Sequence, residues 1–269
     1  MHGHILDDNL RKMVAHHDWW AATYDSDIAG MILYNRITLD NIRRFLPEDR
    51  DGVILDAGGG TGLWSIQLAE MGYRVVLADL SDGMLARARS KIAEAGLGDR
   101  IEVKRSDIRS MPEFADGQFA MVLCEGDPLS YCGDHEAAVR ELARVVRPGG
   151  AVIVSVDNRA SAINWLGEGD LDTVERLIGD GQVLFGPERQ EFRYWIHAFT
   201  PEELSELFES HGLAVERIIG KPVIANRLAA RSSEDPAVQE WLCQLELEHC
   251  DDPAYLSWGG HLEIAGRKR

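Results

Sequence analysis

A glycine-rich segment between an expected strand and an expected helix constrains the fold of this chain most strongly. Residues 55–62 read Leu-Asp-Ala-Gly-Gly-Gly-Thr-Gly. Leu55 ends a wholly apolar run that starts at Val53, and an apolar helical pattern begins at Leu63. Glycines in such a turn permit positive φ angles and let a ligand approach bare backbone. The alternative is a tight turn without a ligand. The context favours a ligand-binding loop at the first strand-to-helix turn of an α/β sheet.

The rest of the chain alternates short apolar runs with amphipathic helical stretches. This rhythm predicts a doubly wound α/β fold, in which helices cover both faces of a mostly parallel sheet. We expect seven strands, the last of them reversed, at residues 53–55, 74–78, 101–104, 119–124, 151–156, 213–219 and 261–267. We expect helices between them at residues 63–71, 81–95, 134–146 and 200–212, and a further one around 238–245.

Two segments fall outside this rhythm. Residues 8–46 read as helical with a break near Asp25-Ser26-Asp27, and residues 158–199 hold a helical stretch and an aromatic run. We interpret residues 1–269 as one domain, in which segments 1–47 and 158–199 form a helical and aromatic cap. The cap would cover the carboxyl ends of the strands, where sheets of this kind bind ligands.

The composition limits the classes of partner. The chain has 45 acidic and 28 basic residues, a formal net charge of −17, which repels phosphate backbones and anionic lipids. We therefore expect a small-molecule partner rather than nucleic acid or a membrane. The four cysteines match no disulfide framework or metal pattern, no apolar run reaches membrane-spanning length, and the first residues do not resemble a signal peptide. A reducing cytoplasmic location without a bound metal is expected, and the oligomeric state is not indicated.

Dinucleotide binding is the main rival interpretation of the loop. A GxGxxG/A pattern that starts at Gly58 places Leu63 at its last position, so the register fails. Asp56, immediately before the glycines, would also repel a pyrophosphate. Asp79 ends the second expected strand, 17 residues after the loop. A carboxylate there can accept both hydroxyls of a ribose, although a solvated turn aspartate is the alternative.

These motifs, in this order, resemble those of class I S-adenosylmethionine-dependent methyltransferases. The resemblance covers about residues 15–156 and includes the loop, Asp79, Ser106-Asp107-Ile108, the strand 119–124 and the turn Arg147–Gly150. Residues 19–25 are similar to a segment of small-molecule members, including quinone-biosynthesis types. The resemblance implies a Rossmann-like sheet with a reversed last strand, S-adenosylmethionine as the cofactor, and in-line methyl transfer to a small-molecule acceptor.

The resemblance also implies a set of cofactor contacts. Asp56 and the loop glycines would face the methionine part, Asp79 would hold the ribose, and Asp107 with Ile108 would flank the adenine. The full set of expected contacts is Tyr24, Asp56, Gly58, Gly60, Asp79, Leu80, Asp107, Ile108 and Glu125. The segment after the fourth strand departs from the motif of amino-directed nucleic-acid methyltransferases, since Leu129 replaces its second proline, so that function is not implied.

The acceptor side is less specified by the sequence. Methyl transfer from a sulfonium needs alignment and desolvation, and a base only if the acceptor must lose a proton. We predict Tyr131 and His197 as acceptor-side residues; His16, His17 and His135 are other candidate bases, and each of the five has a purely structural alternative. Three further functions stay open: a nicotinamide-dependent oxidoreductase, a cofactor-binding protein that is not catalytic or activates a partner, and a methyltransferase of proteins.

Overall fold

The computed structural model describes residues 2–28, 30–166, 171–187, 189–228, 233 and 235–269. The first half of the described chain contains α1 (His2–Trp20), α2 (Tyr24–Asp27), α3 (Ile32–Phe45), β1 (Val53–Ala57), α4 (Leu63–Glu70), β2 (Arg74–Asp79), α5 (Asp82–Glu94), β3 (Ile101–Arg105), β4 (Phe119–Cys124), α6 (Pro128–Tyr131) and α7 (His135–Val145). The second half contains β5 (Val146–Asp157), α8 (Arg159–Ala162), η1 (Ile163–Trp165), α9 (Leu171–Asp180), β6 (Gln182–Phe185), η2 (Gln190–Phe192), β7 (Tyr194–His197), α10 (Pro201–Ser210), β8 (Leu213–Lys221), η3 (Ala225–Arg227), α11 (Pro236–His249), η5 (Leu256–Trp258) and β9 (His261–Lys268).

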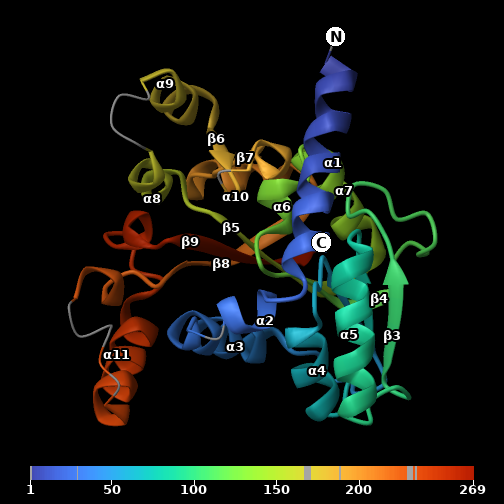
Figure 1. Ribbon diagram of the computed structural model, residues 1–269. Coiled ribbons are helices and arrows are strands. Elements are labelled where there is room, and N and C mark those ends of the chain that lie inside the picture. The colour runs from blue at the N-terminus through green and yellow to red at the C-terminus, as the bar shows by residue number, and fades with distance from the viewer. Residues whose placement is uncertain (1, 29, 167–170, 188, 229–232, 234) are drawn as a thin grey trace.

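The main sheet has seven strands in the order β3-β2-β1-β4-β5-β9-β8 (Figure 1). Strands β1 to β5 pair in parallel, whereas β9 runs antiparallel to both β5 and β8. The predicted doubly wound sheet with a reversed last strand is therefore confirmed. The strand order changes direction between β1 and β4, so the loops after these two strands meet at one crevice, as ligand sites of such sheets require.

The central strands divide the core into two layers because their side chains alternate between the faces of the sheet. Leu55 and Val122 belong to the layer covered by α7 and α10, and Ile54 and Met121 belong to the layer covered by α3, α4 and α5. Both layers are closed to solvent. Burial of an aliphatic side chain of this size contributes about 1.5–3 kcal/mol, which fixes the strands rigidly beneath the crevice.

The start of the chain and the insertion after β5 pack together. Met13 of α1 contacts an apolar cluster that includes Tyr194 and Ile196 of β7. The side chain of Asn9 donates to the carbonyl of Trp195 and accepts from its N–H, at 2.8 and 2.7 Å. Figure 1 shows α1 beside the antiparallel pair β6–β7, which the sequence analysis did not anticipate. Residues 167–170 and 188 of the expected cap segment lie outside the described residues.

Three details differ from the sequence expectations. The helix is interrupted near Asp25-Ser26-Asp27, as expected, but these three residues themselves form the short α2, which Asp27 stabilises by accepting hydrogen bonds from Trp20 and Thr23. Helix α3 packs on the sheet, so only the first part of segment 1–47 joins the cap. Strand β5 starts at Val146, five residues before the expected start at residue 151, and so includes the Pro-Gly-Gly turn. Its pairing with β4 shifts register at this turn. None of the helices in the described part of the chain has the length and apolar character of a membrane span.

Candidate active site

The glycine-rich loop leaves β1 at the centre of the sheet and leads into α4. Gly58 and Gly60 have φ angles of 73° and 53°, which residues with a Cβ rarely adopt. The N–H groups of Gly58 and Gly59 both donate to the carbonyl of Ala78, at 2.7 and 3.1 Å. A Cβ at Gly58 would lie 2.4 Å from the ring of Pro128, whereas open space surrounds the position of a Cβ at Gly60. The loop is thus held on one side and offers bare backbone on the other.

Asp79 lies at the end of β2, as predicted, and its carboxylate is fixed by the backbone. Oδ2 accepts from the N–H of Gly60 at 2.9 Å and Oδ1 from the N–H of Ser81 at 2.8 Å. Burial beneath the cap raises the pKa of Asp79. Each carboxylate oxygen has a second lone pair, so the group can still accept two further hydrogen bonds from a diol.

The segment after β3 supplies a third wall. Ser106, Asp107 and Ile108 all line the crevice. The carboxylate of Asp107 pairs with the guanidinium of Arg109, with distances of 2.7–3.1 Å, which fixes its orientation. The hydroxyl of Ser106 is buried without a hydrogen-bond partner. Ile108 adds apolar surface next to two polar groups, an arrangement that suits a flat heterocycle.

Asp56 corrects one expectation. It is fully buried behind the loop and does not line the crevice. Its Oδ2 accepts from the N–H and the hydroxyl of Ser65 at the start of α4, at 3.1 and 2.6 Å. Burial raises the pKa of Asp56 to about 6. Alternation along β1 turns this side chain inward, where it ties the loop to α4, and this departs from the expectation that Asp56 faces the methionine part of the cofactor.

Two aspartates of the amino-terminal segment attach the cap to the cofactor side of the sheet. Asp18 accepts from the hydroxyl of Ser81 and from the N–H of Gly83 at the start of α5, at 2.5 and 2.8 Å. Asp25 accepts from Thr61 in the loop and from Lys91 on α5, both at 2.7 Å. The Asp25 pairing lies next to Tyr24, so this residue is held over the crevice, as predicted.

The crevice is a cavity of about 280 Å³ that the cap covers. All predicted site residues except Asp56 and His197 line it. Its aromatic lining comes from seven elements and comprises His17, Trp20, Tyr24, Tyr34, Trp64, Tyr131, Phe185 and His261. Two groups of buried charges border the cavity.

The first group, which we call the lysine cluster, consists of Glu125, Lys221 and Glu263, all inaccessible to solvent. The Lys221 ammonium donates to Glu125 at 2.8 Å, to Thr38 at 2.7 Å and to Glu263. All three protons of the ammonium are therefore used. Burial and then the charge of Glu263 raise the pKa of Glu125. Glu125 lines the cavity, as predicted, but its ionic partner is Lys221.

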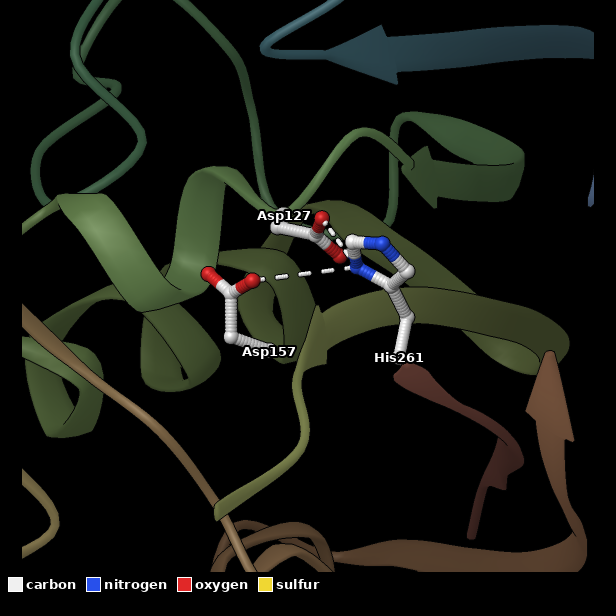
Figure 2. Close-up of side chains that lie close together, drawn as sticks. All are labelled: Asp127, Asp157 and His261. Carbon is white, nitrogen blue, oxygen red and sulfur yellow. Dashed lines mark ion pairs between the residues drawn. The ribbon is translucent and has the colours of Figure 1, made fainter. Parts of the chain in front are cut away.

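The second group, which we call the histidine cluster, consists of Asp127, Asp157 and His261 (Figure 2). Asp127 follows β4, Asp157 ends β5 and His261 starts β9; Asp157 and His261 are directly paired across the two strands. His261 Nδ1 lies 2.8 Å from Asp127 Oδ2 and 3.7 Å from Asp157 Oδ1. No sequence motif marks these residues, because strand register, and not sequence spacing, brings them together.

Charges within the histidine cluster shift its pKa values in different directions. Burial and then Asp127 raise the pKa of Asp157 to about 8. Burial opposes ionisation of Asp127, but His261 outweighs it and lowers the pKa of that carboxyl. Burial likewise opposes protonation of His261, and Asp127 overcomes it and raises the pKa of the imidazole. The charges of Asp127 and His261 therefore stabilise each other, whereas ionisation of Asp157 is opposed.

The two predicted acceptor-side residues have different positions. Tyr131 lines the cavity and stacks on Phe185, with ring centroids 5.7 Å apart. His197 lies outside the cavity, where its Nε2 is 2.7 Å from Glu203 and its ring stacks on His135. The expectation for His197 was wrong because β7 turns alternate residues, Tyr194 and Ile196, toward the cap interior and His197 away from it.

Comparison with known proteins agrees with this arrangement. A family model described as a methyltransferase domain matches residues 54–150. The tRNA 5-carboxymethoxyuridine methyltransferase of Escherichia coli strain K12 is 23% identical over 80% of this chain and 79% of its own length. The ubiquinone biosynthesis O-methyltransferase of Pseudomonas aeruginosa strain UCBPP-PA14 is 27% identical over 76% of this chain and 81% of its own. A solved S-adenosylmethionine-dependent methyltransferase from Methanosarcina mazei superposes with a TM-score of 0.61 at 20% identity, covering 85% of this chain and 96% of that one.

Residues 54–150 carry a methyltransferase domain, and the chain is an S-adenosylmethionine-dependent methyltransferase. The oxidoreductase alternative is thereby set aside. The residues of this methyltransferase also fit its cofactor, S-adenosylmethionine. Asp79 has free acceptor capacity for a ribose, Ser106 has a buried hydroxyl without a partner, and the space beside Gly60 admits a ligand against the backbone.

Proposed function

We propose that this methyltransferase acts on a small-molecule acceptor held beneath the cap. The observation that carries the proposal is the cavity, which continues from the glycine-rich loop to the histidine cluster beneath a roof made by α1, α2 and Phe185 of β6. A ligand at the loop and a second ligand at the cluster would share this space. Apolar, largely enclosed cavities with a few polar groups are typical sites of small molecules.

The cofactor half has residues for each part of S-adenosylmethionine, which supplies an activated methyl group when bound. In our proposal Asp79 accepts the ribose hydroxyls, Asp107 and Ile108 flank the adenine, and the backbone at Gly58 and Gly60 lies along the methionine part. Tyr24 closes this half from above. The main contributions of the protein are then alignment and exclusion of water.

The acceptor half combines aromatic walls with a polar end. Tyr34 and Tyr131 lie beside the two charged clusters, and Phe185 covers them from the insertion. Burial raises the pKa of Tyr131 well above its usual value, so its phenol stays protonated. We therefore propose that Tyr131 donates a hydrogen bond that orients the acceptor, and does not act as a base.

A nucleic-acid acceptor has less support, although one relative is named for activity on tRNA. The chain carries a net charge of −17, and its cavity is bordered by the carboxylates of Asp79, Asp127 and Asp157. A basic surface is the usual requirement for a nucleic-acid site. The same acidic border favours neutral or cationic acceptors over anionic ones.

The acceptor class is tested by methyl transfer from radiolabelled S-adenosylmethionine to panels of small amines, phenols and carboxylic acids, with tRNA and a protein extract in parallel. We expect label in one small-molecule class alone. Limited proteolysis with and without S-adenosylhomocysteine should show protection near Tyr24 when the cap closes on the ligand. Label in tRNA or protein, with no small-molecule product and no protection of the cap, would overturn the proposal.

Asp79 provides the sharpest test of the cofactor half. Asp79→Ala removes the acceptor of two ribose hydrogen bonds, each worth about 1.5–3 kcal/mol when the acceptor is charged. We expect at least a tenfold loss of affinity for S-adenosylhomocysteine in calorimetry. Asp79→Asn keeps one acceptor for the backbone N–H groups and serves as the variant that preserves the fold, and Asp99→Ala, on an exposed turn, is the control. Unchanged affinity in both Asp79 variants would make Asp79 purely structural.

A further inference from the structure

The histidine cluster has more acidic groups than its cation can satisfy. Asp157 is 1% exposed and Asp127 is 4% exposed, yet Asp157 Oδ2 and Asp127 Oδ1 have no hydrogen-bond partner. His261 is the nearest cationic group, and it offers one nitrogen to two carboxylates. Leaving a buried acceptor unsatisfied costs about 1–3 kcal/mol, and more for a charged group. The arrangement is therefore incomplete as an ion pair.

The three side chains converge in a way that a simple ion pair does not require. Figure 2 shows Asp127, Asp157 and the Nδ1 edge of His261 directed toward one another from three different segments. One atom from each lies within 4.8 Å of the other two. Within the described residues, this is the one group of at least three His, Cys, Asp or Glu side chains with such spacing.

Two of the donor distances, both measured from His261, are close to the spacing of ligands to one cation. Two protein ligands bound at about 2.1 Å to the same ion lie roughly 3.0–3.5 Å apart in octahedral or tetrahedral geometry. The distances from His261 Nδ1 to the two aspartates, 2.8 and 3.7 Å, bracket that range. Small side-chain rotations would equalise them, because all three groups border the cavity.

We propose that Asp127, Asp157 and His261 bind a divalent cation at the acceptor end of the cavity. Two carboxylates and one imidazole form a mixed oxygen and nitrogen set, which suits Mn²⁺ or Zn²⁺ better than a soft thiophilic ion. Three protein ligands leave coordination positions that face the cavity. This replaces the sequence expectation of a protein without a metal site.

The neighbouring lysine cluster shows why the same property is not assigned there. Its two carboxylates surround an ammonium whose three donors are all occupied, and Lys221 also lies 4.3 Å from the centre of the Tyr34 ring. A cation is already built into that cluster. In the histidine cluster the two carboxylates share a single nitrogen of one imidazole.

A cation at this position would hold an oxygen of the acceptor in its open coordination positions. An acceptor with two adjacent oxygens, or with a carboxylate beside the methylated atom, has the matching chemistry. This use of the cation rests on the proposed function, whereas binding of the cation does not. The two can therefore be tested separately.

The test uses the full chain, which is first treated with a chelator to strip bound metal and then freed of the chelator. Titration with MnCl₂, followed by the electron paramagnetic resonance signal of free Mn²⁺, should show one saturable site per chain. Asp127→Asn and Asp157→Asn should each weaken binding at least tenfold. Asp99→Asn removes the same charge from an exposed turn and should leave binding unchanged. Nitrogen-15 spectra of the imidazoles with Zn²⁺ should shift Nδ1 of His261, assigned with His261→Gln.

The outcomes separate this inference from the proposed function. No saturable Mn²⁺ binding at 1 mM, or equal binding by wild type and Asp157→Asn with both proteins folded by circular dichroism, overturns the cation site. If calorimetry in the same preparation still shows S-adenosylhomocysteine binding, the methyltransferase assignment stands. Cation binding without any small-molecule methylation would leave the site intact and remove only its proposed use.

Discussion

The lysine cluster and the histidine cluster lie next to each other, on loops and strands that they share. Lys221, His261 and Asp157 form one row across β8, β9 and β5. In the lysine cluster every donor of the cation has an acceptor, and one oxygen of Glu125 has no donor among the described residues. In the histidine cluster, within the same part of the chain, one oxygen of each carboxylate and Nδ1 of the imidazole have no hydrogen-bond partner. The difference teaches that burial of charge does not by itself identify a functional site. The two clusters differ in whether the donors of their cation are all used, as those of Lys221 are.

Loss of the buried ammonium is the largest effect that we expect. Lys221→Met leaves Glu125 and Glu263 buried together without a cation. Breaking a buried ion pair from one side costs about 3–5 kcal/mol. Urea unfolding at pH 7 should show this loss in the free energy of unfolding.

A matched double variant sharpens the result for Lys221. Lys221→Met with Glu263→Met replaces two opposite charges by apolar side chains of similar volume, which is often close to neutral in stability. We expect the double variant to recover a large part of the loss. If Lys221→Met is as stable as the wild type, the lysine cluster does not stabilise the fold, and the contrast with the histidine cluster fails.

His16 is a buried histidine outside the two clusters, and among the described residues it has no carboxylate beside it comparable to those next to His261. Burial and then His17 lower the pKa of His16 to about 4, opposite in direction to His261. Between pH 6.5 and about 4 the unfolded chain therefore binds a proton that the folded chain refuses, so stability falls as the pH falls. With allowance for solvent screening, we expect a loss of about 1–2 kcal/mol at pH 5 relative to pH 7.5. His16→Gln cannot titrate, and an equally large loss in that variant would contradict the assignment.

The smallest effect is expected in the histidine cluster itself. Asp157→Asn removes a carboxylate whose Oδ2 has no partner and which competes with Asp127 for one imidazole. In chelator-treated protein we expect the free energy of unfolding to change by less than about 1 kcal/mol, or to rise. Urea unfolding beside Lys221→Met makes the contrast direct. A loss comparable with that of Lys221→Met would show that the two clusters are equally structural.

The sheet could be predicted from the sequence because its signals are local. Short apolar runs marked the seven strands, and the cap of α10 was visible in Thr200-Pro201-Glu202-Glu203, where the structure has a reciprocal capping box. The pair β6–β7 was missed because an aromatic run does not reveal its partner strand. The breaks around α2 were misplaced because they depend on side-chain contacts of Asp27.

The site divided along similar lines. The glycine-rich loop, Asp79 and the segment after β3 belong to sequence motifs, and they line the cavity. Asp157 and His261 are 104 positions apart and meet only through the pairing of β5 with β9. Asp56 and His197 do not line the cavity, because neither a motif nor an aromatic neighbour says which face of a strand a side chain takes. Alternation within β7 would have separated His197 from Tyr194 before the structure was known.

The attachment of Asp18 and Asp25 to α5 has a kinetic consequence. The roof of the cavity is fastened beside Asp79, so we expect the cavity to empty only when this fastening opens. Turnover would then follow the frequency with which two aspartates release one helix, and would slow in viscous solvent even when the transfer of the methyl group is fast.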